Sequence, residues 1–300
     1  MIKLRHVFLI GFTLLLTGLL SGCHFAILDP KGVIAASEKK LFVDSIFLML
    51  LVVVPVIFLS WIIPYRYRAS NTKAAYKPDW GHSTIMEIIW WTIPCIIILI
   101  LSIWTWIYTH KLDPYRPLAA DENTVMIEAV ALDWKWLFIY PQQHIAVINY
   151  LEIPVNKPVR LFITSDAPMN SLEIPRLAGQ IYAMTGMQTK LNLIATSIGE
   201  YTGLSTNFSG DGFSGMHFKV NVVSESDFDK WVKTAQQSPT HLSQEVYNQV
   251  RKPSENNPVQ YFSAPVPGLF SETVIKYMGP MQGMVLGYAS TAQGRAAKQG

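Results

Sequence analysis

The stretch Leu41–Ile63 reads LFVDSIFLMLLVVVPVIFLSWII, and it decides the architecture of the first third of the chain. A helix needs about 20 predominantly apolar residues, at ~1.5 Å rise each, to cross the hydrocarbon core of a bilayer. A second apolar run, Ile88–Ile107 (IIWWTIPCIIILILSIWTWI), is long enough to cross back. The sequence therefore predicts a helical hairpin with spans at residues 41–63 and 86–108, joined by a loop at residues 64–85.

The charged residues between the two spans indicate the orientation of the hairpin. Arg66, Arg68, Lys73 and Lys77 make this loop basic, and basic loops stay in the cytoplasm under the positive-inside rule. Residues 23–40 and the chain after the second span are then expected in the periplasm. The net charge is only +3, with no dense basic run, so nucleic acid is not an expected partner.

The first residues have the pattern of a lipoprotein signal peptide. Lys3 and Arg5 precede an apolar core that is too short for a permanent span. The core leads into Leu20-Ser21-Gly22-Cys23, which matches the bacterial lipobox. The match implies removal of residues 1–22 and attachment of lipid to the Cys23 thiol. The alternative is an uncleaved signal anchor with a chance cysteine.

From Leu112 onward the pattern changes to that of a water-soluble β domain. Short runs rich in β-branched and aromatic residues are separated by Pro, Gly, Asn or Asp, which is typical of a sandwich or small barrel. The runs are Val125–Val130, Trp134–Ile139, His144–Asn149, Val159–Thr164, Leu191–Thr196 and Phe218–Val223. We therefore predict an all-β domain over residues 112–223.

The residues after these runs favour short helices. Glu225–Gln237 (ESDFDKWVKTAQQ) spaces its apolar residues like a helix, with Ser224 or Ser226 as the candidate N-cap. A second short helix is expected over Ser243–Val250. The predicted segments are a helical extension at residues 224–284 and a disordered tail at residues 285–300.

The cysteine count limits the chemistry of the β domain. The chain has two cysteines, and the second, Cys95, lies inside the second apolar run. No disulfide can therefore form within the β domain, and no thiolate is available there as a metal ligand.

Three stretches resemble one protein family. Ala131–Pro141 (ALDWKWLFIYP) resembles the aromatic segment that opens the cupredoxin domain of subunit II in haem-copper terminal oxidases. Thr164–Leu191 resembles the segment that follows, and Gly199–Phe218 (GEYTGLSTNFSGDGFSGMHF) resembles the loop that holds dinuclear copper in cytochrome c oxidases. The resemblance runs from the lipobox to about Lys276. It implies two transmembrane helices plus an all-β, cupredoxin-like Greek-key sandwich or barrel with short C-terminal helices.

The loop departs from the copper-binding pattern at nearly every ligand. Copper-binding members read Y-x-G-x-C-S-E-x-C-G-x-x-H-x-x-M there, and H-S-x-x-x-P in an earlier segment. The corresponding positions here, in chain order, are Asn170, Ser205, Asn207, Ser209, Phe213 and Met216. A dinuclear copper centre needs thiolates and imidazoles, and of these side chains only the Met216 thioether is a copper ligand, a weak one. The resemblance therefore implies six vestigial ligand positions and no metal in this chain.

A different copper arrangement would use histidines alone. The β domain contains His144, His217 and His241, so a three-histidine site is an alternative. His217 follows Met216 in an expected strand, and successive strand residues face opposite sides of a sheet. This alternation argues against a joint site.

A ligand-less cupredoxin on a membrane hairpin resembles subunit II of the cytochrome bo-type ubiquinol oxidases. The resemblance implies a proton-pumping complex in which ubiquinol supplies the electrons to O2. The haems, one copper and all catalytic residues would then belong to subunit I. The implied partners are oxidase subunits I, III and IV and membrane lipids. The implied location is the bacterial inner membrane, as a two-pass, lipid-anchored chain.

Two other functions remain as alternatives. A copper-carrying subunit II of a cytochrome c oxidase would need the missing cysteine pair. A non-respiratory lipoprotein could use a cupredoxin scaffold for binding or assembly, because a fold does not fix a function.

Two further features attract functional hypotheses. Glu87 lies at the cytoplasmic end of the second span, and carboxylates at membrane depth tend to be functional. In the resembling family, a glutamate at this place sits at the mouth of a proton channel into subunit I; a carboxylate merely lying at the interface is the alternative. Trp134 and Trp136 flank Lys135, and in the absence of a metal we expect these rings to pack against subunit I.

Overall fold

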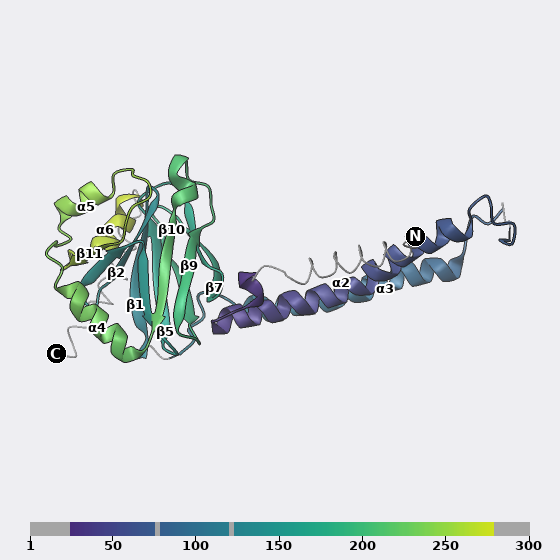
Figure 1. The fold of residues 1–300 in the computed structure, drawn as a ribbon, viewed down its shortest axis with the longest axis horizontal. Helices are drawn as coiled ribbons and strands as arrows, with labels where there is room; N and C mark the ends of the chain where they lie inside the picture. The colour runs from purple at the N-terminus through teal and green to yellow at the C-terminus, as the bar shows by residue number, and fades with distance from the viewer. Residues whose placement is uncertain (1–24, 76–78, 120–122, 279–300) are drawn as a thin grey trace, which may run out of the picture. The chain divides into compact units, whose positions relative to one another are not determined.

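The computed structural model describes residues 25–75, 79–119 and 123–278 (Figure 1). The expected signal peptide at 1–22, the lipid site at Cys23 and the tail at 285–300 lie outside these ranges. The chain divides into two compact units, residues 37–116 and the remainder. We describe each unit by itself.

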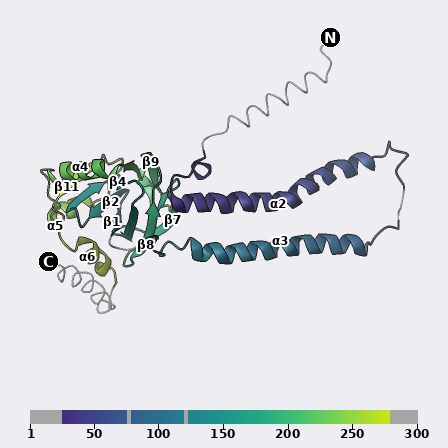
Figure 2. The same ribbon diagram turned by 90° about the horizontal axis from the view of Figure 1, so that it is seen from below.

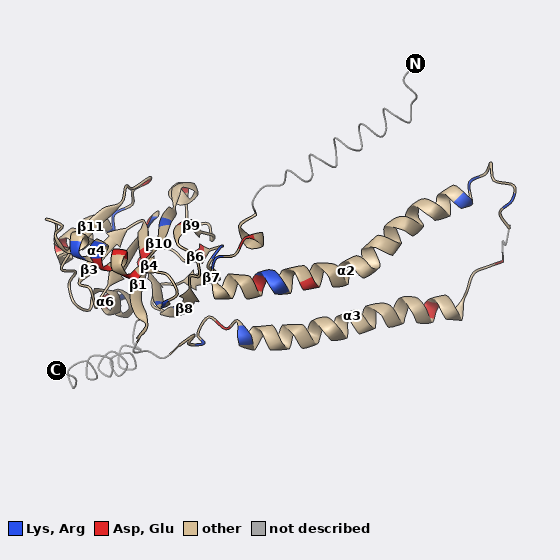
Figure 3. Ribbon diagram, turned by 60° about the horizontal axis from the view of Figure 1, so that its bottom comes forward, with Lys and Arg blue, Asp and Glu red and all other residues tan. Residues whose placement is uncertain are grey.

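The smaller unit consists of two long helices, α2 (Val33–Arg66) and α3 (Thr84–Lys111), which run alongside each other (Figure 2). Both are long and apolar enough to cross a membrane. Charged side chains are absent from α2 between Asp44 and Arg66 and from α3 between Glu87 and Lys111 (Figure 3). The predicted pair of apolar helices is confirmed, although each helix extends beyond the predicted span at both ends.

The larger unit is a sandwich of two sheets. The first sheet has the strand order β11-β3-β2-β1-β5-β8 and the second has the order β4-β10-β9-β6-β7. The strands are β1 (Val125–Leu132), β2 (Lys135–Tyr140), β3 (Ile145–Ile148), β4 (Tyr150–Pro154), β5 (Pro158–Ser165), β6 (Asn170–Ile174), β7 (Ala178–Ala183), β8 (Thr189–Ile194), β9 (Gly199–Ser205), β10 (His217–Val223) and β11 (Gln260–Ser263). The predicted cupredoxin-like β domain is confirmed.

Pairing within the sheets is mainly antiparallel. The exceptions are β1 with β5, where Val125 lies opposite Val159, and β10 with β4, where Val220 lies opposite Leu151. The facing sides of the two sheets bury one core, in which Trp136, Phe138 and Phe218 form a cluster of aromatic rings. Of the vestigial ligand positions, Met216 belongs to this core.

A second core covers the outer face of the first sheet. The short helices α5 (Gln244–Val250) and α6 (Leu269–Lys276) bury apolar side chains, including Tyr247 and Phe270, against β1, β2 and β3. Strands covered on both faces read as nearly continuous apolar runs. This double burial explains why the sequence of the first sheet is so easily recognised.

Helix α4 (Glu225–Gln236) closes one end of the sandwich and confirms the helix predicted there. The Ser224 hydroxyl accepts a hydrogen bond from the Asp227 amide at 3.2 Å, so Ser224 is the N-cap. Ser243 caps α5 in the same way, through the Val246 amide. A capping hydroxyl supplies a partner to an otherwise unsatisfied amide at the start of a helix.

The C-terminal extension was predicted to be helical, but it is not helical throughout. It also contributes β11, which pairs antiparallel with β3 from Gln260 opposite Ile148 to Ser263 opposite Ile145. It is joined to the sandwich by Asp166, whose carboxylate accepts hydrogen bonds from Lys276 Nζ at 2.6 Å, Tyr277 OH at 2.6 Å and Tyr247 OH at 2.8 Å. The extension is therefore an integral part of the β domain.

The segment before α2 is also bound to the β domain. The Lys31 amide donates to the Arg176 carbonyl at 2.6 Å, and the Lys31 carbonyl accepts from the Thr196 amide at 2.7 Å. The next residue, Gly32, forms an isolated antiparallel β-bridge with Ala195. A Cβ atom at position 32 would lie only 2.2 Å from the Leu177 carbonyl oxygen, so this close approach requires glycine.

Candidate functional site

Three of the vestigial ligand positions meet in one buried cluster. The Asn170 side-chain amide lies 3.1 Å from the Ser209 hydroxyl and 3.1 Å from the Met216 sulfur. Its carbonyl oxygen accepts a hydrogen bond from the Ser171 amide at 2.8 Å. Asn170 is 1% exposed and Met216 is 2% exposed. These side chains satisfy one another in the place where the copper-binding pattern has metal ligands.

Ser205, a fourth vestigial position, is bound from inside the sandwich. Its hydroxyl accepts a hydrogen bond from the indole Nε1 of Trp136 at 2.9 Å. Trp136 is fully buried, so its indole N–H needs a partner inside the protein. The expectation that Trp136 packs against subunit I is wrong, because its ring is already enclosed by the core of its own domain.

Trp134 contacts the same loop from the other side. Its indole Nε1 donates to the Ser209 carbonyl at 3.2 Å. A Cβ atom at Gly212 would lie 2.5 Å from its ring, so only glycine fits there. Trp134 itself adopts a left-handed φ of 61° in the tight turn between β1 and β2, a conformation that is strained for a bulky residue. Trp134 and Trp136 therefore each donate an indole hydrogen bond to the loop, to Ser209 and Ser205 respectively.

The remaining two positions turn away from the cluster. The Asn207 side-chain amide donates to the Met169 carbonyl at 2.9 Å on the exposed side of the loop. Phe213 lies in the short 3₁₀-helix η3 (Asp211–Gly215) and packs edge-on against Phe208, with ring centroids 5.6 Å apart. Phe208 is 75% exposed. The six positions thus do not converge on a common point.

Lys135, between the two tryptophans, is buried and fixes a second loop. Its ammonium group donates to the Lys252 carbonyl at 2.9 Å and to the Ser254 hydroxyl. Burial lowers the pKa of Lys135. The Ser254 hydroxyl in turn donates to Asn257 at 2.8 Å. The whole segment Trp134–Trp136 therefore organises the loops around the cluster.

The donor set of the cluster does not fit copper. An amide, hydroxyls and one thioether offer neither thiolate nor imidazole, which are the ligands that copper centres of this kind use. Across residues 25–75, 79–119 and 123–278, no three His, Cys, Asp or Glu side chains lie close enough to hold a metal ion. His217 is exposed while the adjacent Met216 is buried, as strand alternation predicts.

Glu87 lies in the first turn of α3, where its carboxylate approaches the His82 Nε2 at 2.9 Å. The glutamate side chain is 41% exposed and the histidine side chain is 67% exposed. An acidic residue in the first turn of a helix is favoured by the helix dipole. Glu87 therefore has a partner that the sequence alone did not reveal.

Sequence reasoning missed the contacts that shape this site. The pairing of Trp136 with Ser205 joins residues 69 positions apart, and that of Trp134 with Ser209 joins residues 75 positions apart. Nothing local in the sequence signals such contacts. The available signal was indirect, because glycines at 210 and 212 next to an otherwise polar loop suggest close approach of a bulky group.

The chain matches known families over most of its length. Residues 97–223 match the periplasmic domain of cytochrome c oxidase subunit II, and residues 236–281 match the aromatic-rich motif of these oxidases. These matches define the class of the β domain.

Relatives of known name identify the family within this class. The chain is 53% identical over 265 residues to cytochrome bo(3) ubiquinol oxidase subunit 2 of Pseudomonas putida, covering 88% of this chain and 84% of that protein. It is 48% identical to the subunit of the same name from Pseudomonas aeruginosa, covering 94% and 86%. It is also 48% identical to ubiquinol oxidase subunit 2 of Acetobacter aceti, covering 88% and 86%. The chain belongs to the ubiquinol oxidase subunit 2 family.

Proposed function

We propose that this chain is a membrane-anchored subunit 2 of a ubiquinol oxidase, a complex that oxidises ubiquinol and reduces O2 to water. Its role is to support the catalytic subunit without carrying a redox centre. The observation that carries this proposal is the cluster of Asn170, Ser209 and Met216, in which hydrogen bonds occupy the vestigial ligand positions.

The chemistry of the electron donor supports this role. A copper relay in a periplasmic domain serves a soluble donor that docks outside the membrane. Ubiquinol instead delivers its electrons within the membrane, so the β domain needs no metal. The haems and the one copper of the complex would then lie in subunit I, and proton pumping would be a property of that subunit.

The exposed apolar helices support the proposed partners. Along most of α2 and α3 the side chains are exposed, including Trp61 at 78% and Trp106 at 71%. Pro55 and Pro94 lie inside these helices, and neighbouring helices commonly satisfy the carbonyls that proline frees in a membrane. We assign this surface to lipid and to oxidase subunits I, III and IV in the bacterial inner membrane, with lipid attached at Cys23.

Glu87 is the proposed proton-entry residue. Its place at the start of α3, half-exposed and paired with His82, suits a group that takes protons from water and passes them on. Glu87→Ala should slow turnover while the complex still assembles. Asp79→Ala, which removes another carboxylate from the same loop, is the matched control. Unchanged turnover of Glu87→Ala at every pH would sink this assignment.

The decisive test is metal analysis of the intact, detergent-solubilised complex, paired with oxygen uptake on ubiquinol and on reduced cytochrome c. One copper per complex, with oxidation of ubiquinol only, supports the proposal. Three coppers with turnover on cytochrome c would make the chain a copper-carrying subunit. Absence of haem from the purified material would favour the scaffold lipoprotein instead.

A further inference from the structure

Exposed apolar side chains gather at the end of the second sheet where β6 begins and β7 ends. Asn170 and Ala183 lie opposite each other in this pair of strands, and both are buried. Successive strand residues face opposite sides of a sheet, so Met169 and Tyr182 point away from the core. They are 45% and 48% exposed, and Met187 in the following turn is 52% exposed. We call these three side chains the methionine patch; grouped apolar side chains of this kind mark contact sites.

The described part of the chain ends beside this patch. The Tyr277 hydroxyl donates to Asp166 at 2.6 Å, directly after the end of β5. The Tyr277 carbonyl oxygen approaches the turn between β7 and β8 so closely that a Cβ atom at Gly186 would lie 3.0 Å from it. The next residue of this turn is Met187. The chain therefore leaves the described part, at Met278, close to the methionine patch.

The residues that follow have the composition of a partner for this patch. Residues 279–288 read GPMQGMVLGY, with five apolar side chains and no charged residue. Methionine adapts its flexible, polarizable side chain to irregular apolar surfaces. A segment tethered at the edge of its binding site has an effective concentration of about millimolar or more. Weak apolar contacts therefore suffice to hold this segment in place.

We propose that residues 279–288 fold back onto the β domain and cover the methionine patch. Met284, Val285 and Leu286 of the segment contact the thioethers and the Tyr182 ring on the sheet. Removal of apolar surface from water on both sides stabilises the contact. This binding surface goes beyond the proposed function and does not depend on it.

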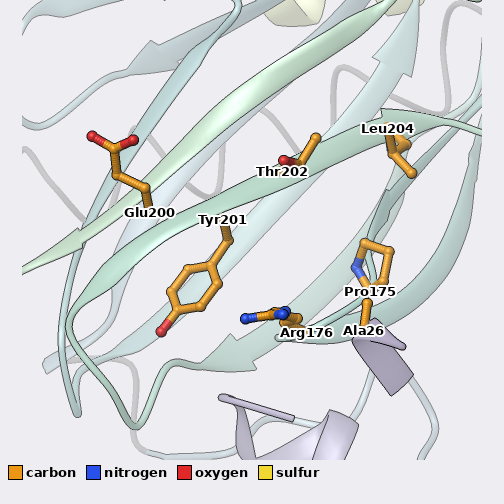
Figure 4. A pocket seen from close by; sticks show the side chains of 7 residues that line it. All are labelled: Ala26, Pro175, Arg176, Glu200, Tyr201, Thr202 and Leu204. Atoms are coloured by element: carbon orange, nitrogen blue, oxygen red, sulfur yellow. The ribbon is translucent and has the colours of Figure 1, made fainter. Parts of the chain in front are cut away.

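The cavity beside β9 is a poorer site for the same segment. This cavity has a volume of about 370 Å³ and is lined by Ala26, Pro175, Arg176 and side chains of β9 (Figure 4). Figure 4 shows the Arg176 guanidinium and the Glu200 carboxylate among the lining groups. Residues 279–288 carry no charge that could pair with either group, and covering a charged group without a partner is costly.

The outer face of the first sheet is a second poorer site. Helices α5 and α6 already bury Tyr247 and Phe270 against β1, β2 and β3 on this face. Met126 of β1 also points to this face, because its neighbours Val125 and Ile127 belong to the core between the sheets. Met126 therefore reports whether the segment binds there instead.

The test is methionine oxidation by dilute hydrogen peroxide, with the sulfoxide at each position measured by peptide mass spectrometry. It uses the full-length chain in detergent and the intact oxidase complex. A chain that stops after Met278 should be oxidised about fivefold faster at Met169 and Met187, because both lose their cover. Met126 should not change. Met216, which is 2% exposed, should stay protected and shows that the domain is folded.

A point variant of the segment keeps the chain at full length. Leu286→Asp places a charge in the apolar contact and should expose Met169 and Met187 as the truncation does. Thr291→Asp, just beyond the segment, is the matched control and should leave both methionines protected. If fast oxidation of Met216 shows that the truncated chain is unfolded, Leu286→Asp decides the result alone.

A variant of the patch tests the same contact from the other side. Tyr182→Asp should speed oxidation of Met281 and Met284, which lie in the segment itself. Equal oxidation of Met169 in the wild type, the truncated chain and Leu286→Asp would overturn the proposal. Faster oxidation of Met126 after truncation would place the segment on the first sheet and overturn it too. Protection of the patch only in the intact complex would overturn it in favour of cover by a neighbouring subunit.

Discussion

Asn170 donates its side-chain amide to the thioether sulfur of Met216 across 3.1 Å, inside a cluster where the copper-binding pattern places a histidine and a methionine ligand. Sulfur is a weak hydrogen-bond acceptor, but in a buried site it spares the amide from having no partner. The same amide also binds the Ser209 hydroxyl. Asn170 thus links Ser209, inside the Ser205–Met216 loop, to Met216 at its end.

The first prediction concerns this residue. Asn170→Ala should destabilise the β domain by about 1–3 kcal/mol, because the Ser209 hydroxyl and the Ser171 amide lose a buried partner. The measurement is chemical unfolding of the full-length chain in detergent, followed by tryptophan fluorescence. Asn207→Ala is the control, since its amide binds on the exposed side of the loop, and it should change stability by less than about 0.5 kcal/mol. Equal effects of the two variants would contradict the structural role of Asn170.

The second prediction concerns the buried indole. Ser205→Ala removes the hydroxyl that accepts from Trp136 Nε1, and a buried donor without a partner costs about 1–3 kcal/mol. Ser205→Thr keeps a hydroxyl and should recover most of that loss. Ser214→Ala, on the exposed side of the loop, is the control in the same unfolding assay. No loss of stability in Ser205→Ala would mean that the indole finds another partner.

The third prediction is that acid weakens the contacts that Asp166 makes with the C-terminal extension. Burial raises the pKa of Asp166, but hydrogen bonds from Lys276, Tyr277 and Tyr247 outweigh burial and leave this pKa below its ordinary value. The contribution of Asp166 to stability is therefore fully present above the unfolded pKa of about 4. It is lost as pH falls below that value and through the folded pKa.

Hydrogen exchange of α6 in the detergent-solubilised chain, measured from pH 6 down to pH 3, tests this dependence. The protection of α6 amides, taken relative to the intrinsic exchange rate at each pH, should fall only below about pH 4. In Asp166→Asn this protection should already be low at pH 6, because a neutral amide replaces hydrogen bonds to a charged group that are worth about 1.5–3 kcal/mol each. A wild-type profile that is flat to pH 3 would rule out Asp166 as the acid-sensitive contact.

The fourth prediction has the opposite sign. Burial raises the pKa of Glu128 on β1 from 4.5 to about 7, so the folded domain binds a proton that the unfolded chain releases. Stability should fall as pH rises from about 4.5 to 7 and then level off. Glu128→Gln should remove this dependence and stabilise the domain at pH 8 by up to about 3 kcal/mol.

Thermal unfolding of the full-length chain in detergent at pH 5 and pH 8 measures this effect. Glu173→Gln is a useful comparison, because burial also raises the pKa of Glu173 but that residue lies in the other sheet. If Glu128→Gln and the wild type lose the same stability between the two pH values, Glu128 is not the group responsible.

The two sheets differ in how far their sequences reveal them. In the first sheet, five of the six strands follow apolar runs that the sequence marks clearly, and three of these, β1, β2 and β3, are covered on both faces. In the second sheet only β10 was predicted. β9 alternates buried Tyr201 with exposed Glu200 and Thr202, and β6 contains Asn170 and Ser171. Their composition is that of a loop, and only pairing with neighbouring strands makes them regular.

The site was predictable in its chemistry but not in its packing. Residue types alone established that the loop lacks thiolate and imidazole at the vestigial positions. They could not indicate that Trp136 would be enclosed by its own domain, or that Lys135 would be buried between loops. The buried Lys135 ammonium depends on the carbonyl of Lys252, which lies 117 positions away in the sequence. Only the folded structure brings these two residues together.

The position of β11 has a consequence for biogenesis. Ribosomes deliver the chain from its N-terminus, so β3 is made long before Gln260–Ser263 can pair with it. Until then Ile145–Ile148, buried throughout in the finished protein, presents an open apolar edge of the kind that invites aggregation. The newly made domain therefore needs protection until its last strand arrives, and a chain ending before residue 260 would never lose that vulnerable edge.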